Sequence, residues 1–157
     1  MPKYSAPEKL LGLDISDPKS TDCFYLAIHV FHLLMQNSEP FGYKENSDGN
    51  PISKLHEHIS NGDCLYVKSI PGKVLRKHSI KPGVLPDDIL KAFNRTFNYT
   101  RDNLPTRIKE RTTASEWCKV LEPYLIDDSR IKKCAVKIEH VYSSHLKECP
   151  WCKPSAP

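Results

Sequence analysis

Cysteine and histidine gather toward the end of this 157-residue chain at spacings that suit a metal ion. Cys149 and Cys152 are separated by two residues, so one tight turn can bring both thiolates to the same ion. Cys134 and His140 precede them and can complete a tetrahedral set of three thiolates and one imidazole. His145 competes with His140 for the fourth position, and we favour His140 because we expect His145 to lie on a helical approach to the turn. The pattern predicts a closed, structural site with Zn²⁺ as its cofactor.

The remaining cysteines, Cys23, Cys64 and Cys118, are scattered along the chain. The first residues show no basic segment followed by an apolar stretch, the pattern of a secretory signal peptide. Disulfide bonds are then the weaker interpretation, and we expect these three thiols to be buried as small apolar side chains. No apolar run approaches the roughly 20 residues that span a bilayer. The expectation is a cytoplasmic protein without a membrane partner.

Charge is moderate overall but uneven. The composition, 39% hydrophobic and 27% charged with a net charge of +4, is that of a globular protein. A basic segment runs between Cys64 and Pro86 without an acidic residue, and its Lys73, Arg76 and Lys77 could contact a phosphate or an acidic peptide. A solvated loop is the alternative that we favour for such a run of charges. No aromatic side chains interleave with these cations to stack on bases, so nucleic acid is a weakly supported partner.

The strongest helix prediction covers residues 20–36. Ser20, Thr21 and Asp22 offer side chains that cap a helix N-terminus. The stretch from Phe24 to Met35 is apolar almost all round, which is typical of a helix inside a core.

Further segments carry helical signals of their own. A short helical turn is expected at residues 7–11, and residues 52–59 repeat apolar side chains at helical spacing before a glycine stop. A proline and two aspartates open a helix at 86–98. Thr113 and Glu116 have the spacing of a capping box that starts another helix.

The order of these segments resembles that of a protein kinase. Residues 4–8 (Tyr-Ser-Ala-Pro-Glu) resemble the Ala-Pro-Glu end of a kinase activation segment. The apolar helix headed by Asp22 runs into Pro40 and Phe41, which is similar to the kinase F helix and the Pro-Phe pair that follows it.

The resemblance continues through the next helices. The segments 52–62 and 85–98 resemble the G and H helices of the kinase C-lobe. Residues 111–117 (Arg-Thr-Thr-Ala-Ser-Glu-Trp) resemble the opening of its last helix, with Thr112 in place of the usual proline. Residues 4–121 therefore resemble, in order, the lower half of a kinase C-lobe.

This resemblance implies roles for three residues. Glu8 and Arg111 would form a buried ion pair that ties the activation segment to the base of the lobe, because a guanidinium can fork onto a carboxylate. Asp22 would accept hydrogen bonds from a catalytic loop, although its position equally allows it to cap its own helix.

The Cys/His segment fits the same resemblance. In one group of bacterial and phage-associated kinase-like proteins, a short element ending in Cys-Pro-Trp-Cys follows the lobe, as residues 149–152 do here. The expected fold is mainly α, with a partial kinase-like C-lobe at 1–126 and a small zinc-ribbon or knuckle-like element at 132–153.

The phosphate-transfer motifs of a kinase are not found in these 157 residues, which hold no Gly-rich loop, strand lysine, His-Arg-Asp or Asp-Phe-Gly. In a whole kinase those motifs would precede residue 1, so we expect a truncated serine/threonine protein kinase-like chain that is inactive alone and has no ATP site. The alternatives are a zinc-stabilised module that binds a protein or nucleic acid, and one half of a split kinase whose missing N-terminal part is another chain.

Overall fold

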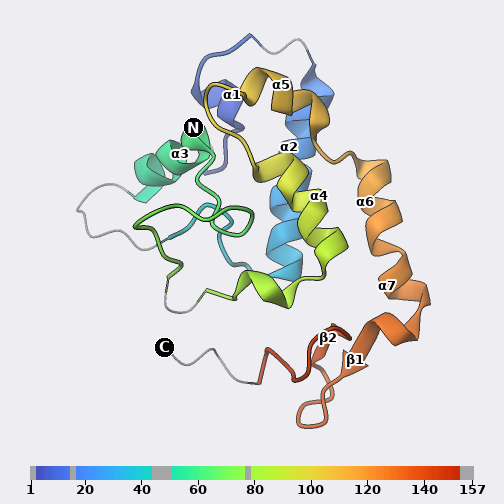
Figure 1. Ribbon diagram of the computed structural model, residues 1–157. Helices are drawn as coiled ribbons and strands as arrows, with labels where there is room; N and C mark the ends of the chain where they lie inside the picture. Colours follow the sequence, from blue (N-terminus) through green and yellow to red (C-terminus); the bar gives the residue numbers. More distant parts are fainter. Residues whose placement is uncertain (1–2, 15–16, 44–50, 77–78, 153–157) are drawn as a thin grey trace.

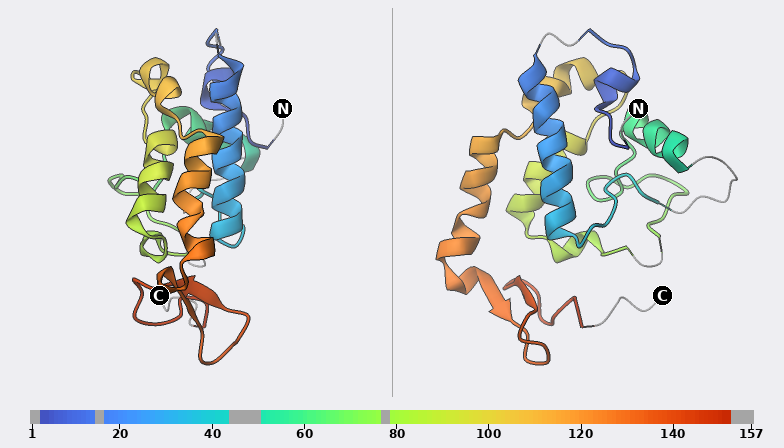
Figure 2. Two further views of the ribbon diagram at one scale, coloured as in Figure 1. Left: turned by 90° about the vertical axis from the view of Figure 1, so that its right-hand side faces the viewer. Right: turned by 180° about the vertical axis from the view of Figure 1, so that it is seen from behind.

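The central element is the helix α2 (Pro18–Leu34), which runs through the middle of the structure (Figures 1 and 2). A computed structural model describes residues 3–14, 17–43, 51–76 and 79–152. Helix α2 begins where it does because the Asp17 carboxylate accepts the N–H of Lys19 at 3.0 Å and because Pro18 lacks an N–H that would need a partner. The expected start at residues 20–22 is therefore wrong. Asp22 lies exposed on the second turn and does not cap the helix.

Only one side of α2 faces the core. Phe24, Ile28 and Phe31 are at most 1% exposed. On the other side His29 is exposed and Leu33 is 83% exposed. The expectation of a helix buried all round is wrong, because among the described residues no neighbouring element covers that second side.

The other helices surround α2, and most lie where the sequence predicts them. Helix α1 packs against α3, α2 against α4, and α4 against α6. Their bounds, with the 3-10 turns η1–η3, are α1 (Pro7–Leu10), α3 (Pro51–Asn61), η1 (Pro82–Val84), α4 (Asp87–Phe97), α5 (Leu104–Arg107), η2 (Ile108–Glu110), α6 (Ala114–Leu121), α7 (Pro123–Ile126) and η3 (Asp128–Arg130).

The start of α6 confirms the predicted capping box. The N–H of Thr113 donates to Glu116 Oε2 at 2.8 Å, and the N–H of Glu116 donates back to Thr113 Oγ1 at 3.3 Å. The Thr113 N–H, helped by Arg95, lowers the pKa of Glu116 to about 2. Two backbone donors at the helix end are thereby satisfied.

Phenylalanine rings fill the core between α2, α4 and the segment that follows α2. Their ring centroids lie 5.2–6.3 Å apart, mostly edge to face, the arrangement that aromatic quadrupoles favour. Trp117 of α6 completes the cluster at 4.8 Å from Phe93. The rings belong to Phe24, Phe31, Phe41, Phe93 and Phe97.

Gly62 ends α3 as the sequence predicts, and the structure explains why the residue is glycine. Its φ is +69°, and a Cβ there would lie 2.2 Å from the carbonyl oxygen of Tyr99. Both the left-handed backbone and the close approach of a second chain segment exclude a side chain.

The chain after α7 changes from helix to a small hairpin at the lower end of the molecule (Figures 1 and 2). Strands β1 (Ile131–Lys133) and β2 (Val141–Ser143) pair antiparallel. No helix in the described part of the chain is both long and apolar enough to cross a membrane. The scattered cysteines differ from one another: Cys64 is buried, but Cys118 is exposed, so the expectation of burial is wrong for Cys118.

Candidate metal centre

The hairpin sets the first pair of candidate ligands opposite each other. Lys133 of β1 pairs with Val141 of β2, so Cys134 and His140, one step beyond, face each other where the strands open. The N–H of Cys134 donates to the carbonyl of His140 at 2.9 Å. Local strand pairing therefore positions two ligands that are six residues apart in sequence.

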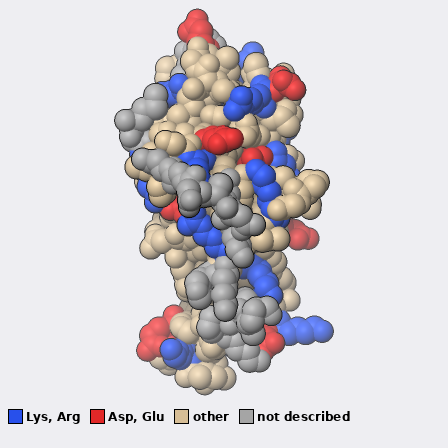
Figure 3. Space-filling view, turned by 90° about the vertical axis from the view of Figure 1, so that its left-hand side faces the viewer, with Lys and Arg blue, Asp and Glu red and all other residues tan. Residues whose placement is uncertain are grey.

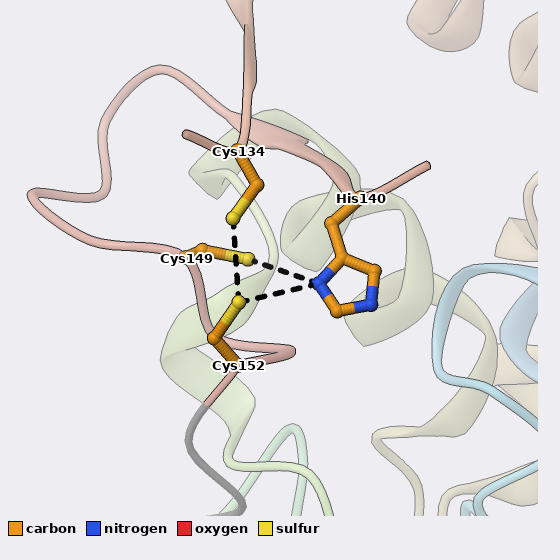
Figure 4. A group of neighbouring side chains, drawn as sticks. All are labelled: Cys134, His140, Cys149 and Cys152. Atoms are coloured by element: carbon orange, nitrogen blue, oxygen red, sulfur yellow. Dashed lines mark hydrogen bonds between the residues drawn. The ribbon is translucent and has the colours of Figure 1, made fainter. Parts of the chain in front are cut away.

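The Cys149–Cys152 turn brings the second pair against the first. Cys134 Sγ lies 3.3 Å from Cys152 Sγ, and His140 Nδ1 lies 3.4 Å from Cys152 Sγ and 3.6 Å from Cys149 Sγ. All four donor atoms are within 4.8 Å of one another, and Figure 4 shows their side chains converging on one point. A tetrahedral ion with metal–sulfur bonds of about 2.3 Å sets its ligands about 3.5–3.8 Å apart. The four residues could therefore bind a metal ion with little adjustment.

The loop from 135 to 139 prepares Cys134 for this role. The N–H groups of Lys137 and Val136 point at Cys134 Sγ, at 3.5 Å and 3.3 Å. These donors, Lys137 first, lower the pKa of the Cys134 thiol to about 7. Cys152 makes a hydrogen bond with Cys134, and this bond together with burial raises the pKa of the Cys152 thiol to about 11. Cys134 therefore ionises more readily than Cys152, and thiolate is the form that binds metal.

His145, the alternative ligand, is placed elsewhere. Its Nδ1 lies 2.8 Å from Ser143 Oγ and its Nε2 lies 3.1 Å from the carbonyl oxygen of Gly83. The residue sits in a turn after β2, so the expected helical approach is wrong. His145 links the hairpin to η1 and is not one of the four clustered side chains.

Trp151 holds the cysteine turn against the hairpin. Its indole N–H donates to the carbonyl of Val141 at 2.8 Å. The second pair of ligands is therefore fixed to the first through the protein itself.

The structure also brings Glu8 and Arg111 together, deep in the lobe. Arg111 donates to both carboxylate oxygens of Glu8, at 2.8 Å and 2.7 Å, and the two side chains are 2% and 0% exposed. Burial alone would raise the pKa of Glu8, but the hydrogen bonds and charge of Arg111 outweigh burial and lower it. Thr21, for which the sequence gives no such signal, donates its hydroxyl to the same carboxylate at 2.8 Å. Asp22, one residue further on, takes no part in this network.

Two cations of the basic segment, Lys73 and Arg76, make contacts within the molecule. Lys73 pairs with Asp63 at 3.0 Å and donates to the Tyr43 hydroxyl. Arg76 Nε donates to the carbonyl of Tyr43 at 3.4 Å, and Lys77 lies outside the described residues. Figure 3 shows basic side chains spread down this face with acidic ones between them. An anion contact here stays a prediction.

Comparison with known proteins adds a relative to this picture. No family model and no solved structure matches the chain. The curated proteins that match are both named protein kinase YegI, from Escherichia coli O157:H7 and from Escherichia coli strain K12, each 31% identical over 134 residues and 83% of this chain. The match supports a kinase-like relationship. The chain spans 19% of the length of these relatives.

Proposed function

We propose that this chain is the lower part of a protein-kinase-like C-lobe, residues 1–126, followed by a structural zinc element at 132–153. The Glu8–Arg111 ion pair is the observation that supports the C-lobe proposal. The two residues are 103 positions apart in the chain, and the kinase resemblance implies that they pair. The similarity to protein kinase YegI supports the same proposal.

Zinc is the ion that the donor set favours. Three sulfurs and one imidazole nitrogen suit a soft or borderline metal and disfavour Mg²⁺ or Ca²⁺. Four protein ligands leave no open position for a substrate or a reactive water, which is the arrangement of a structural zinc site. The role of the ion is then to fold the element that contains it.

We further propose that these residues alone do not transfer phosphate. Kinase catalysis depends on groups that position the ATP phosphates and Mg²⁺ and accept the proton of the attacking hydroxyl. The motifs that supply those groups are not among these 157 residues. The Glu8–Arg111 pair supports the lobe and does not reach a substrate.

The purified zinc-loaded chain should therefore transfer no labelled γ-phosphate from ATP, either to itself or to a Ser/Thr peptide, and calorimetry should detect no ATP binding. An Arg111→Met preparation made in parallel is the control, because a contaminating kinase would give equal transfer in both. Transfer by the wild-type chain that disappears in the variant would overturn the proposal.

A second candidate function follows from the open side of α2. Asp22 and His29 are exposed there, seven residues apart and so on one side of the helix. We propose that a separate chain carrying the catalytic motifs covers this side, which would make the protein one half of a split kinase.

Co-expression with the catalytic half of a related kinase tests this candidate. The wild-type chain should co-purify with that half, and Asp22→Lys/His29→Glu should reduce the recovered complex at least about tenfold. Asp14→Lys changes an exposed acidic residue elsewhere and should have no effect. Equal recovery of all three proteins would contradict the candidate.

A further inference from the structure

An apolar groove separates the helical lobe from the metal element. Its volume is about 390 Å³, and its walls come from the end of α2, the η1–α4 junction, α6, α7 and the hairpin. Leu34, Leu85 and Ile89 line the lobe side, and Val141 and Trp151 line the hairpin side. An apolar hollow of this size is a place where a partner's side chains can be buried.

One acidic residue lies in the wall of this groove. Glu139 is the only Asp, Glu, Lys or Arg among the described residues that line it. Glu139 belongs to the hairpin side of the groove and precedes His140 in the chain. An occupant that is apolar but carries one positive charge would match the groove.

The loop between Cys134 and His140 has that chemistry. Val136 and Ile138 are 79% and 78% exposed, and Lys137 lies between them. The loop projects from the lower end of the molecule in each ribbon view (Figures 1 and 2). Exposed aliphatic side chains at such a projecting position are unfavourable in water unless something covers them.

The loop is held in shape from its base. The N–H of His140 donates to the carbonyl of Lys137 at 3.0 Å, and the N–H of Cys134 to the carbonyl of His140 at 2.9 Å. Little conformational entropy is therefore lost when the loop binds. The seven side-chain carbons of Val136 and Ile138 need about 200 Å³ at the roughly 30 Å³ of a water-sized group, so the groove has room for both.

We infer that the groove of one copy of this chain receives the Val136–Lys137–Ile138 loop of a second copy. The loop and the groove adjoin at Glu139, so a two-fold axis can insert both loops at once. Lys137 of each copy then meets Glu139 of the other, and the two apolar surfaces cover each other. The inference goes beyond the proposed kinase-like role and uses the metal site only for the shape of the loop.

Sedimentation equilibrium of the zinc-loaded full chain tests this inference. The wild-type chain should form dimers, and Val136→Ser/Ile138→Ser should weaken dimerisation at least about a hundredfold, because two aliphatic side chains lose their burial. Leu13→Ser/Val74→Ser removes two exposed aliphatic side chains from the lobe and should leave the dimer unchanged. Zinc content measured in every variant separates loss of the interface from loss of the metal element.

Charge reversal provides the decisive comparison. Lys137→Glu alone and Glu139→Lys alone should each weaken self-association about tenfold or more, since like charges then face each other. Mixed in equal amounts, the two variants should form a one-to-one heterodimer, because every contact again pairs a lysine with a glutamate. A monomeric wild-type chain, or a mixture that gains no association, would overturn the inference and leave the proposed metal site unaffected.

Discussion

Arg111→Met should lower the free energy of unfolding by about 3–5 kcal/mol, because it leaves the Glu8 carboxylate buried without a counter-charge. The wild-type pair is almost fully buried, and both terminal guanidinium nitrogens donate to the Glu8 carboxylate. The variant also frees the carbonyl of Ser20, which accepts from Arg111 at 2.9 Å. Urea unfolding followed by the fluorescence of the buried Trp117 measures the change.

An exposed ion pair provides the matched comparison. Arg95 pairs with Glu116 at 2.7 Å with both side chains more than a third exposed, so Arg95→Met should cost less than about 1 kcal/mol. Replacing both partners of the buried pair, Glu8→Leu with Arg111→Met, should restore part of the lost stability because no charge is then left unpaired. A single Arg111→Met variant as stable as Arg95→Met would contradict the argument.

The pH dependence of stability gives the same prediction a second measurement. The pKa of Glu8 is lowered in the folded chain, so its contribution is fully present above the unfolded pKa of about 4.3. That contribution is lost as the pH falls through the folded pKa. The stability difference between wild type and Arg111→Met should therefore shrink on acidification and be largest near neutral pH.

The lobe shows where local sequence signals suffice. The Thr113–Glu116 capping box depends only on residues three apart, and it forms as predicted. The start of α2 is less clear, although its aspartate followed by proline is a local signal for a helix start. The Ser-Thr-Asp run two residues later competes with that signal, and sequence alone does not say which cap is used.

Most features that the sequence does not predict depend on contacts between segments far apart in the chain. Thr21 supports Glu8 because α1 and α2 meet in the folded chain, and Leu33 stays exposed because no described element lies over it. His145 is hydrogen-bonded to the carbonyl of Gly83, 62 residues away in the chain. No local pattern reports such partners, because burial depends on the tertiary arrangement and not on the residue type.

The candidate metal site depends partly on local sequence spacing and partly on the folded arrangement. The spacing of Cys149 and Cys152 identified one pair, and strand register explains why Cys134 and His140 form the other. His145 lies outside the cluster of four candidate ligands, in a turn and not on the expected helical approach. Ligand spacing is informative because the chain between two ligands limits where both can lie.

Removal of the metal should unfold the 131–152 element while the lobe remains folded. Cys149→Ser/Cys152→Ser removes two of the four candidate donors, so its zinc affinity should fall by more than the 10–100-fold that loss of a supporting residue costs. Hydrogen exchange of residues 131–152 should become fast, because two three-residue strands cannot hold a hairpin without the ion. Zinc release to a chromogenic chelator measures the affinity.

Matched variants assign the ligands one at a time. His140→Ala should lose zinc, whereas His145→Ala should keep one ion per chain, since His145 is bonded to Ser143 and Gly83. Cys118→Ser removes an exposed thiol outside the cluster and should bind zinc like the wild type. If His145→Ala lost zinc and His140→Ala retained it, the ligand set would be wrong. Hydrogen exchange in α2 and α4 should stay slow when the hairpin loses the metal. If it became fast as well, the lobe would need the metal element in order to fold, and the element would not be a separate unit.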